Sequence, residues 1–214
     1  MPVPNPTWIF RFIHIDNLEI YLQRGGIHSP NHTPDDGFVY KTIHNIDIQS
    51  HRRLTQIPCS SGGSIHDYVP FYFGPRSPML YRLHTRWETD YKDGQESLIY
   101  LISTVQTMNY AGKNFVFSDG HGIAVFTEWF DNLANLNNVD WETVYTWFWR
   151  DTVEDMDRQR RKQAEFLVYG FCEWSLIHEI GVINNHMKSR AENIMKVFQP
   201  ELHRPVYIRR DWYY

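Results

Sequence analysis

The sequence predicts an α+β fold in a single domain covering residues 1–214. Segments with strand and helix patterns follow one another without the repeated strand–helix–strand order of a doubly wound sheet. Hydrophobic residues make up 42% of the chain and charged residues 21%, which excludes disorder as the dominant state. A length of 214 residues suits one ordinary domain with its own core.

The first third of the chain is expected to form one strand and one helix. Residues 8–15 alternate in polarity and are rich in β-forming side chains, so they read as a strand. Residues 18–24 fit a short helix that Asp16 and Asn17 can cap and that the glycine pair at 25–26 ends. The loops and polar segments that follow are residues 29–37, 47–53 and 57–64.

The middle third combines strands with one short helix. Residues 69–73 read as a strand, and Pro70 indicates an edge strand or a strand start because proline has no N–H to donate. A rigid turn follows at residues 74–78. Residues 79–84 are expected to be helical, and further strands are expected at residues 97–105 and 115–118.

The last third is expected to begin with a long helix. Residues 125–149 read as mostly helical, with Trp129, Phe130, Leu133 and Leu136 as an apolar stripe. A charged run at 151–162 precedes a strand at 164–169. Additional strands are expected at residues 177–183 and 206–208, with a helix at 188–198 between them.

Several protein classes are excluded or disfavoured. The chain has no apolar run of about 20 residues, so we expect no membrane span. Residues 1–8 lack the basic-then-apolar layout of a signal peptide, and two cysteines make no disulfide framework, so a reducing cytoplasm is expected. The 11 histidines are scattered and no zinc or nucleotide-loop motif occurs, so no metal is expected.

Aromatic residues are abundant, at 16% of the chain. Most aromatic side chains build cores, but they also form platforms for flat ligands such as nucleobases and nicotinamide. The net charge of −4 does not indicate nucleic-acid binding by the molecule as a whole. A nucleic-acid partner would therefore need a local basic surface, and residues 158–162 contain the one dense run of Arg and Lys.

Three further features have both an ordinary and a functional interpretation. Glu165 opens a strand-like segment and is either a solvated carboxylate or one held beside a cleft, where it can bond a sugar hydroxyl or take a proton. Arg52 and Arg53 follow His51 in a basic triplet that is either surface charge or a grip for a diphosphate. His14 is either a structural histidine or part of a strand whose backbone bonds a planar amide.

Four segments of the chain together resemble the DarT family of DNA ADP-ribosyltransferase toxins. The most specific is HDYVPFYFGPRSPMLY at residues 66–81. The others are IHIDNL at residues 13–18, QAEFLVY at 163–169 and RRDWYY at 209–214. The resemblance runs from about Ile9 to the end of the sequence, and it is greatest to the thymidine-modifying branch.

The resemblance implies an ADP-ribosyltransferase fold with a split central sheet and an NAD+-binding cleft. It implies transfer of ADP-ribose from NAD+, as co-substrate, to thymine in single-stranded DNA, with release of nicotinamide. The alternative acceptors are guanine in DNA, RNA, and protein. The implied partners are single-stranded DNA and an antitoxin macrodomain protein that removes the ADP-ribose.

The resemblance also implies roles for particular residues. The family's catalytic glutamate falls on Glu165 and its essential arginine on Arg52, with Arg53 one position away. Residues 36–53 would close over NAD+, and residues 120–165 would recognise the substrate. NAD+ contacts are expected from Ile13, His14, Ile15, Leu22 and Arg52, and DNA contacts from Tyr72, Arg76, His121, Arg158 and Arg161.

Overall fold

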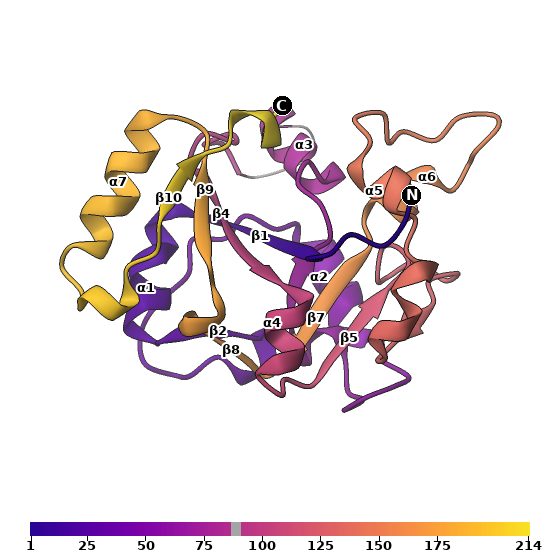
Figure 1. Ribbon diagram of the computed structural model, residues 1–214, viewed down its shortest axis with the longest axis horizontal. Coiled ribbons are helices and arrows are strands. Elements are labelled where there is room, and N and C mark those ends of the chain that lie inside the picture. The colour runs from indigo at the N-terminus through magenta and orange to yellow at the C-terminus, as the bar shows by residue number, and fades with distance from the viewer. Residues whose placement is uncertain (87–90) are drawn as a thin grey trace.

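The structure is a computed structural model that describes residues 1–86 and 91–214 (Figure 1). Its centre is an eight-stranded sheet in the order β10-β9-β4-β1-β3-β7-β5-β6, beside a two-stranded sheet of β2 and β8. The strands are β1 (Trp8–His14), β2 (Gly26–His28), β3 (Tyr68–Tyr72), β4 (Leu98–Thr104), β5 (Phe115–Ser118), β6 (Trp129–Phe130), β7 (Glu165–Tyr169), β8 (Phe171–Glu173), β9 (Glu179–Val182) and β10 (Val206–Ile208). Neighbouring strands of the large sheet are antiparallel except β9 and β10. The α+β prediction is confirmed.

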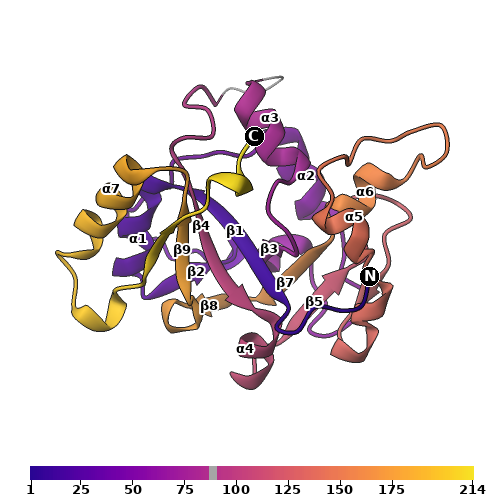
Figure 2. The ribbon, with the colours of Figure 1, turned by 45° about the horizontal axis from the view of Figure 1, so that its top comes forward.

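Short helices surround this sheet. They are α1 (Leu18–Gln23), α2 (Ile46–Leu54), α3 (Pro78–Thr85), α4 (Val105–Tyr110), α5 (Trp141–Tyr145), α6 (Arg158–Lys162) and α7 (Asn185–Met195). Helices α1 and α7 pack together at one end of the molecule, whereas α5 and α6 lie at the other end (Figures 1 and 2). None of the helices described has the length and apolar character needed to cross a membrane.

The central sheet is split between β1 and β3. Strand β1 pairs with β4 along its whole length, and β3 pairs with β7 at five positions, but β1 and β3 share only the pair Phe10 and Tyr72. Pro70 explains part of this opening. Its carbonyl accepts a bond of 3.0 Å from Nη1 of Arg11 on β1, and a strand residue's N and C=O point to the same side, so the missing N–H also faces β1.

The prediction that Pro70 marks an edge or a strand start is wrong, because Pro70 is the third residue of β3, which lies between β1 and β7. Its missing N–H is tolerated there because it faces the split. Strand β3 is fully paired only on the side of β7, and its other side borders the split. The rings of Phe12 and Tyr72 stack across the split with their planes 12° apart. The two halves of the sheet are thus held together by side chains where the backbone ladder is missing.

The C-terminal segment is part of the core. Tyr213 is 2% exposed, and its hydroxyl donates to the carbonyl of Leu98 on β4 at 2.9 Å. It packs with Phe10, Phe12 and Leu80 in a hydrophobic cluster beneath α3. In Figure 2 the C-terminus consequently lies beside α3.

The predicted long helix over residues 125–149 is wrong. This segment forms the two-residue strand β6, a 3₁₀ turn over Leu133–Asn138 and the five-residue helix α5. Asn and Asp side chains interrupt a continuous helix because they bond the backbone locally. Asn132 accepts from the N–H of Ala134, and Asp140 accepts from that of Thr143.

Two helices also differ from expectation. Helix α2 forms where the sequence showed only a polar stretch, because Asn45 caps it by accepting from two backbone N–H groups and few apolar residues mark its inner face. Helix α7 begins at Asn185, three residues before the expected start, because Asn184 supplies the N-cap. The remaining predicted strands and short helices agree with the structure within one or two residues.

Candidate active site

Arg52 and Glu165 meet in a buried ion pair. Arg52 lies in the last turn of α2, and Glu165 is the first residue of β7. The two Nη atoms of the guanidinium donate to the two carboxylate oxygens, each at 2.8 Å. Arg52 is 7% exposed and Glu165 is 1% exposed. The two residues that the sequence singled out for catalysis are therefore in direct bidentate contact.

Neighbouring strands fix the position of Glu165. Its backbone N–H donates to the hydroxyl of Ser118 at the end of β5, at 3.2 Å. Its carboxylate also accepts from the backbone N–H of Gly122, just beyond β5. The donors to the carboxylate are thus Arg52 of α2 and the backbone of Gly122, whereas Ser118 holds the backbone of Glu165.

The electrostatic surroundings keep this pair charged. Burial alone would raise the pKa of Glu165, but the Arg52 guanidinium outweighs burial and lowers it, so the carboxylate stays ionised. Tyr72 lies directly opposite Glu165 in the β3–β7 register. Burial and the nearby carboxylate raise the pKa of Tyr72 well above its usual 10, so the phenol is neutral. Burial lowers the pKa of His121 below 6.5, which favours a neutral imidazole.

A cavity of 1240 Å³ opens over the ion pair, and we call it the catalytic cleft. It runs along the split between β1 and β3. Its lining comes from two parts of the chain. Residues in or near α1, β2 and α2 contribute Asn17, Tyr21, His28, Tyr40, Lys41, His44, Asn45 and Gln49, and residues of α3 and of the segment 149–163 contribute Met79, Tyr81, Arg82, Thr85, Trp149, Arg150, Gln159 and Gln163. Arg52 and Glu165 line the same cavity, together with His121. A cavity of this volume is large enough for an extended ligand.

The predicted NAD+ contacts divide into two groups. Ile13 and Arg52 line the catalytic cleft. Ile13 is also part of the hydrophobic core, whereas Ile15, in the turn after β1, and Leu22, in α1, lie in that core and do not line the cleft. His14 is 2% exposed and does not line the cleft: its Nδ1 accepts from the N–H of Asp16, so it caps the turn after β1.

The predicted DNA contacts also divide. Tyr72 and His121 line the catalytic cleft, whereas Arg76 lies outside it, against a second cavity. Arg158 is half-buried and does not line either cavity. Arg161 is already engaged: its Nη1 donates to Asp140 at 2.7 Å, and its Nη2 pairs with Asp155.

The basic run at 158–162 is therefore largely structural. Arg160 pairs with Asp119 and Asp157, and Lys162 is buried and donates to the carbonyls of Val144 and Thr146 at 2.6 and 2.9 Å. These bonds fasten the long segment between β5 and β7 to α6. Asp155 and Asp157 are near neighbours in the sequence, but Asp119 and Asp140 are distant and meet the arginines only in the fold.

Several cleft residues were missed by sequence reasoning. Arg11 lies at the split, bonds Pro70 across it and has a buried Nε without a partner among the described residues. His44, His66, Tyr81 and Trp149 also line the cleft. In the sequence, only the high content of histidine and aromatic residues points to them, and a composition does not show which positions line a cleft. Arg11 lies on a strand and lines the cleft. A charged residue between apolar ones in residues 8–15 could have indicated this position.

Comparisons with known proteins agree with this geometry. A family model described as "ssDNA thymidine ADP-ribosyltransferase, DarT" matches residues 10–214. A DNA ADP-ribosyl transferase of Thermus sp. (strain 2.9) is 42% identical over 212 residues, which cover 99% of this chain and 98% of that protein. This similarity extends over nearly the whole chain.

Solved structures match as closely. The Thermus sp. 2.9 DarT in complex with ADP-ribosylated ssDNA superposes with a TM-score of 0.93 at 40% identity, covering 100% of this chain and 99% of that one. The same Thermus protein in complex with NAD+ superposes with a TM-score of 0.89 at 38% identity, covering 100% of both chains. The fold predicted from the resemblance, a split sheet with a cleft between its halves, is therefore confirmed.

Proposed function

The chain belongs to the DarT family of single-stranded DNA thymidine ADP-ribosyltransferases, and from this premise we propose how its residues carry out the reaction. The enzyme transfers ADP-ribose from NAD+ to thymine in single-stranded DNA and releases nicotinamide. NAD+ is the co-substrate. The observation that carries the proposed mechanism is the buried bidentate pair of Arg52 and Glu165 in the catalytic cleft.

Glu165 acts on the ribose of NAD+. The bond that breaks joins the nicotinamide nitrogen to the anomeric carbon, and its electron pair leaves with neutral nicotinamide, so no general acid is needed. The sugar then carries positive charge in an oxocarbenium-like transition state. An ionised carboxylate that is fixed in place beforehand stabilises this charge and can bond a ribose hydroxyl. The lowered pKa of Glu165 keeps it in that ionised form.

Arg52 acts at the same centre in an electrostatic role. A thymine nitrogen becomes the nucleophile only after its proton leaves, and Glu165 is the group placed to take that proton. A guanidinium has a pKa above about 12 and is a poor base. Pairing with Glu165 raises the pKa of Arg52 further, in opposition to burial. Arg52 therefore holds Glu165 in orientation and stabilises either the diphosphate of NAD+ or the deprotonated base.

The end of the cleft bounded by Tyr40, Lys41 and His44 is the NAD+ side. These residues lie in or next to the segment 36–53, which covers the split. Arg11 supports this placement, because its buried Nε has no partner in the described part of the chain and an anionic or carbonyl group of the ligand would satisfy it. Ile13 offers strand backbone next to the split, where β1 lacks a partner on its β3 side.

The opposite end, bounded by α3 and residues 149–163, is the acceptor side. Tyr72 and His121 line the cleft beside Glu165. The modified position of thymine is hidden by base pairing in a duplex, so a single strand can present it without the energy of base flipping. The neutral phenol and imidazole can bond a base without adding charge beside the carboxylate.

We further propose that an antitoxin macrodomain protein reverses the modification. This proposal rests on membership of a toxin family. Co-expression is its test: such a protein should remove ADP-ribose from oligonucleotides modified by this enzyme and restore growth of cells that express it.

Mass spectrometry of modified oligonucleotides tests the function. Oligonucleotides that differ in one base are incubated with NAD+ and the enzyme, and the adduct is located by fragmentation. We expect one ADP-ribose on thymine, and no adduct with Glu165→Ala. An adduct on guanine, on RNA or on protein in a lysate with none on thymine would overturn the assignment, as would full activity of the Glu165 variant.

A further inference from the structure

A segment without regular structure borders the catalytic cleft, and we call it the cover segment. It consists of residues 33–45, which lie between the 3₁₀ turn Pro30–His32 and α2. All of these residues are described by the structure, and they form neither helix nor strand. Those that line the cleft are Thr33, Tyr40, Lys41, Ile43, His44 and Asn45. Without a helix or a strand ladder, the cover segment depends on side chains for its position.

Side chains hold the cover segment near both of its ends. Near the start, Arg24 at the end of α1 binds Asp36, with its Nε donating to Oδ2 at 2.7 Å. At the other end, Asn45 caps α2 by accepting from two backbone N–H groups. Helix α2 is in turn fixed by the pair of Arg52 and Glu165. The middle of the segment is anchored separately.

That middle anchor is Lys41, which is held through both its backbone and its side chain. The side chain of Asn17 accepts from the N–H of Lys41 at 2.7 Å and donates to its carbonyl at 2.9 Å. The Nζ atom of Lys41 pairs with Oδ2 of Asp93 and lies 3.7 Å from Oδ2 of Asp16. Asp93 belongs to the segment that precedes β4. Lys41 therefore joins the cover segment to two other parts of the chain.

Asp93 also faces the end of β1. The Nε2 atom of His14 lies 3.3 Å from the same Oδ2 of Asp93 that Lys41 binds. The Nδ1 atom of His14 accepts from the N–H of Asp16, so the ring proton is on Nε2 and available to Asp93. Burial lowers the pKa of His14, which keeps the imidazole neutral. One carboxylate thus connects the cover segment with the strand that borders the split.

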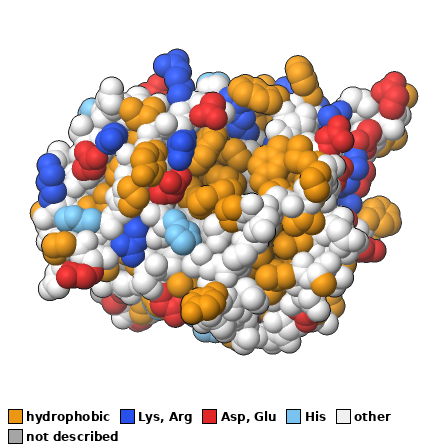
Figure 3. All heavy atoms as spheres, in the orientation of Figure 1, with side chains coloured by type: hydrophobic (Ala, Val, Ile, Leu, Met, Phe, Trp, Pro, Cys, Tyr) orange, Lys and Arg blue, Asp and Glu red, His pale blue; other side chains and the backbone are white. Residues whose placement is uncertain are grey.

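This arrangement differs from an ordinary surface ion pair. Basic and acidic side chains lie side by side over α7 on the face drawn in Figure 3, and Lys188 and Glu192 of that helix are 3.9 Å apart. Such a pair joins neighbouring turns of a helix that is already formed, so it contributes little. Lys41 and Asp93 are 52 positions apart. Their contact therefore restrains a segment that has no regular structure of its own.

We propose that Lys41 and Asp93 form a clasp that holds the cover segment over NAD+, which makes them positioning residues for NAD+ binding. This inference rests on the proposed function, because that function assigns the NAD+ side of the cleft. Without the clasp, NAD+ itself must order the cover segment, which lowers its affinity. The pair of Arg52 and Glu165 keeps its contacts, so the chemical step and the binding of the oligonucleotide should change little.

A charge swap tests the clasp. Lys41→Glu, Asp93→Lys and the double variant are compared with the wild type in steady-state kinetics. Each single substitution places like charges together, so we expect KM for NAD+ to rise about 10-fold while kcat and KM for the oligonucleotide stay within about 2-fold. The double variant restores an opposite-charge pair, and its KM for NAD+ should be about 3-fold or more below that of either single variant.

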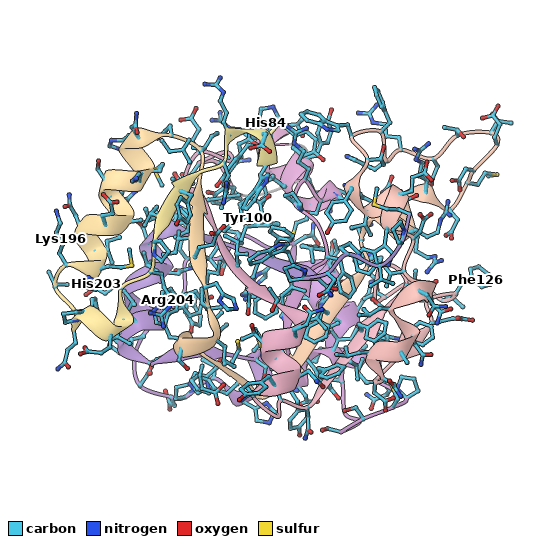
Figure 4. The ribbon with its side chains drawn as sticks, viewed as in Figure 1. His84, Tyr100, Phe126, Lys196, His203 and Arg204 are labelled. Carbon is cyan, nitrogen blue, oxygen red and sulfur yellow. The ribbon has the colours of Figure 1, made fainter. Side chains whose placement is uncertain are left out.

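The pair of Lys188 and Glu192 on α7 provides the matched control. Their side chains are 39% and 43% exposed, close to the 42% and 39% of the clasp. In Figure 4, Lys196 of the same helix lies at the outer edge of the molecule, away from Tyr100 in the central sheet. Lys188→Glu, Glu192→Lys and their double variant should leave KM for NAD+ as in the wild type.

Limited proteolysis reports on the cover segment without catalysis. Chymotrypsin cuts after aromatic residues, and Phe38 in the cover segment is 44% exposed. Without NAD+, cleavage after Phe38 should be faster in Asp93→Lys than in the wild type, and saturating NAD+ should slow it in both proteins. Mass spectrometry locates the cut. If a reversed charge prevents folding, Asp93→Asn provides the same comparison, because it removes the charge and keeps the size of the side chain.

Three results would overturn the proposal. They are an unchanged KM for NAD+ in both single variants, an equal rise in KM for NAD+ and for the oligonucleotide, and a double variant as impaired as Lys41→Glu. The last result would mean that Lys41 contacts NAD+ directly and needs no clasp. Absence of any DNA modification by the wild-type protein would instead show that the proposed function is wrong, and proteolysis would still report whether Asp93 restrains the cover segment.

Discussion

Arg52 and Glu165 are joined by two parallel hydrogen bonds of 2.8 Å, although 113 residues separate them in the sequence. One is supplied by a polar helix that covers the cleft and the other by a strand of the central sheet. Movement of α2 would therefore change the orientation of the catalytic carboxylate. This contact links the NAD+ side of the cleft to the reacting centre.

Glu165→Gln should abolish most of the activity. The amide keeps the size of the side chain but removes the negative charge that stabilises the ribose cation, so we expect kcat to fall by about 10³-fold. The unpaired Arg52 should also lower the free energy of unfolding by about 3 kcal/mol. Single-turnover assays and urea titration measure both effects. Glu201→Gln, on an exposed 3₁₀ turn, is the control, and retention of a tenth of the activity by Glu165→Gln would contradict the assigned role.

His121 should make the protein less stable in mild acid. Burial lowers its pKa in the folded state below 6.5, so the unfolded state binds more protons as the pH falls through that value. The free energy of unfolding should therefore be greatest above about pH 6.5 and decrease below it. His121→Gln should show a smaller decrease between pH 7.5 and pH 5 than the wild type, as measured by urea titration at each pH. Identical decreases in the two proteins would argue against a neutral, buried His121.

Local patterns in the sequence predicted most of the sheet but not its cleft. Alternation and β-forming side chains identified β1, β4, β5 and β7, because each is a continuous run with a buried face. The split depends on Pro70 and Arg11, which come from strands that are neighbours only in the fold. No pattern within one segment reveals which strands will be adjacent.

The site was predicted through resemblance more than through local chemistry. Taken alone, Glu165 and Arg52 had ordinary surface interpretations. The basic run at 158–162 misled for a related reason: Arg160 and Arg161 find their carboxylates at Asp119 and Asp140, which are distant in sequence. Charge in a run shows where binding is possible, whereas the fold decides whether the charge is already paired.

Lys162 should stabilise the protein more at high pH. Burial and then Arg76 lower its pKa from 10.5 to about 8, so the unfolded state binds more protons between these values and stability rises with pH across that range. A difference of this size corresponds to about 3 kcal/mol. Lys162→Met should remove this rise, which denaturant titrations at pH 8 and pH 10 would measure. Lys188→Met, on the surface of α7, should keep it, and a rise that persists in Lys162→Met would refute the assignment.

Arg161→Ala should loosen the segment between β5 and β7. The variant loses the pairs with Asp140 and Asp155, which are partly exposed, so the cost in stability is about 1 kcal/mol. Because this segment borders the acceptor side, we expect KM for the oligonucleotide to rise several-fold and limited proteolysis within residues 119–157 to speed up. Lys196→Ala, on α7, provides the comparison. Weaker DNA binding with unchanged proteolysis would instead indicate that Arg161 contacts DNA directly.

Asn17→Ala should weaken NAD+ binding. Asn17 is 5% exposed, and its side chain bonds both the N–H and the carbonyl of Lys41, at 2.7 and 2.9 Å, which anchors the segment over the NAD+ side. Loss of both bonds should lower the free energy of unfolding by about 1–2 kcal/mol and raise KM for NAD+ about 10-fold, because the segment must then be ordered by the ligand. KM for the oligonucleotide, measured at saturating NAD+, should change little, since the segment that Asn17 anchors at Lys41 is the one proposed to cover NAD+. A parallel rise in both KM values would mean that Asn17 supports the whole cleft and not the NAD+ side alone.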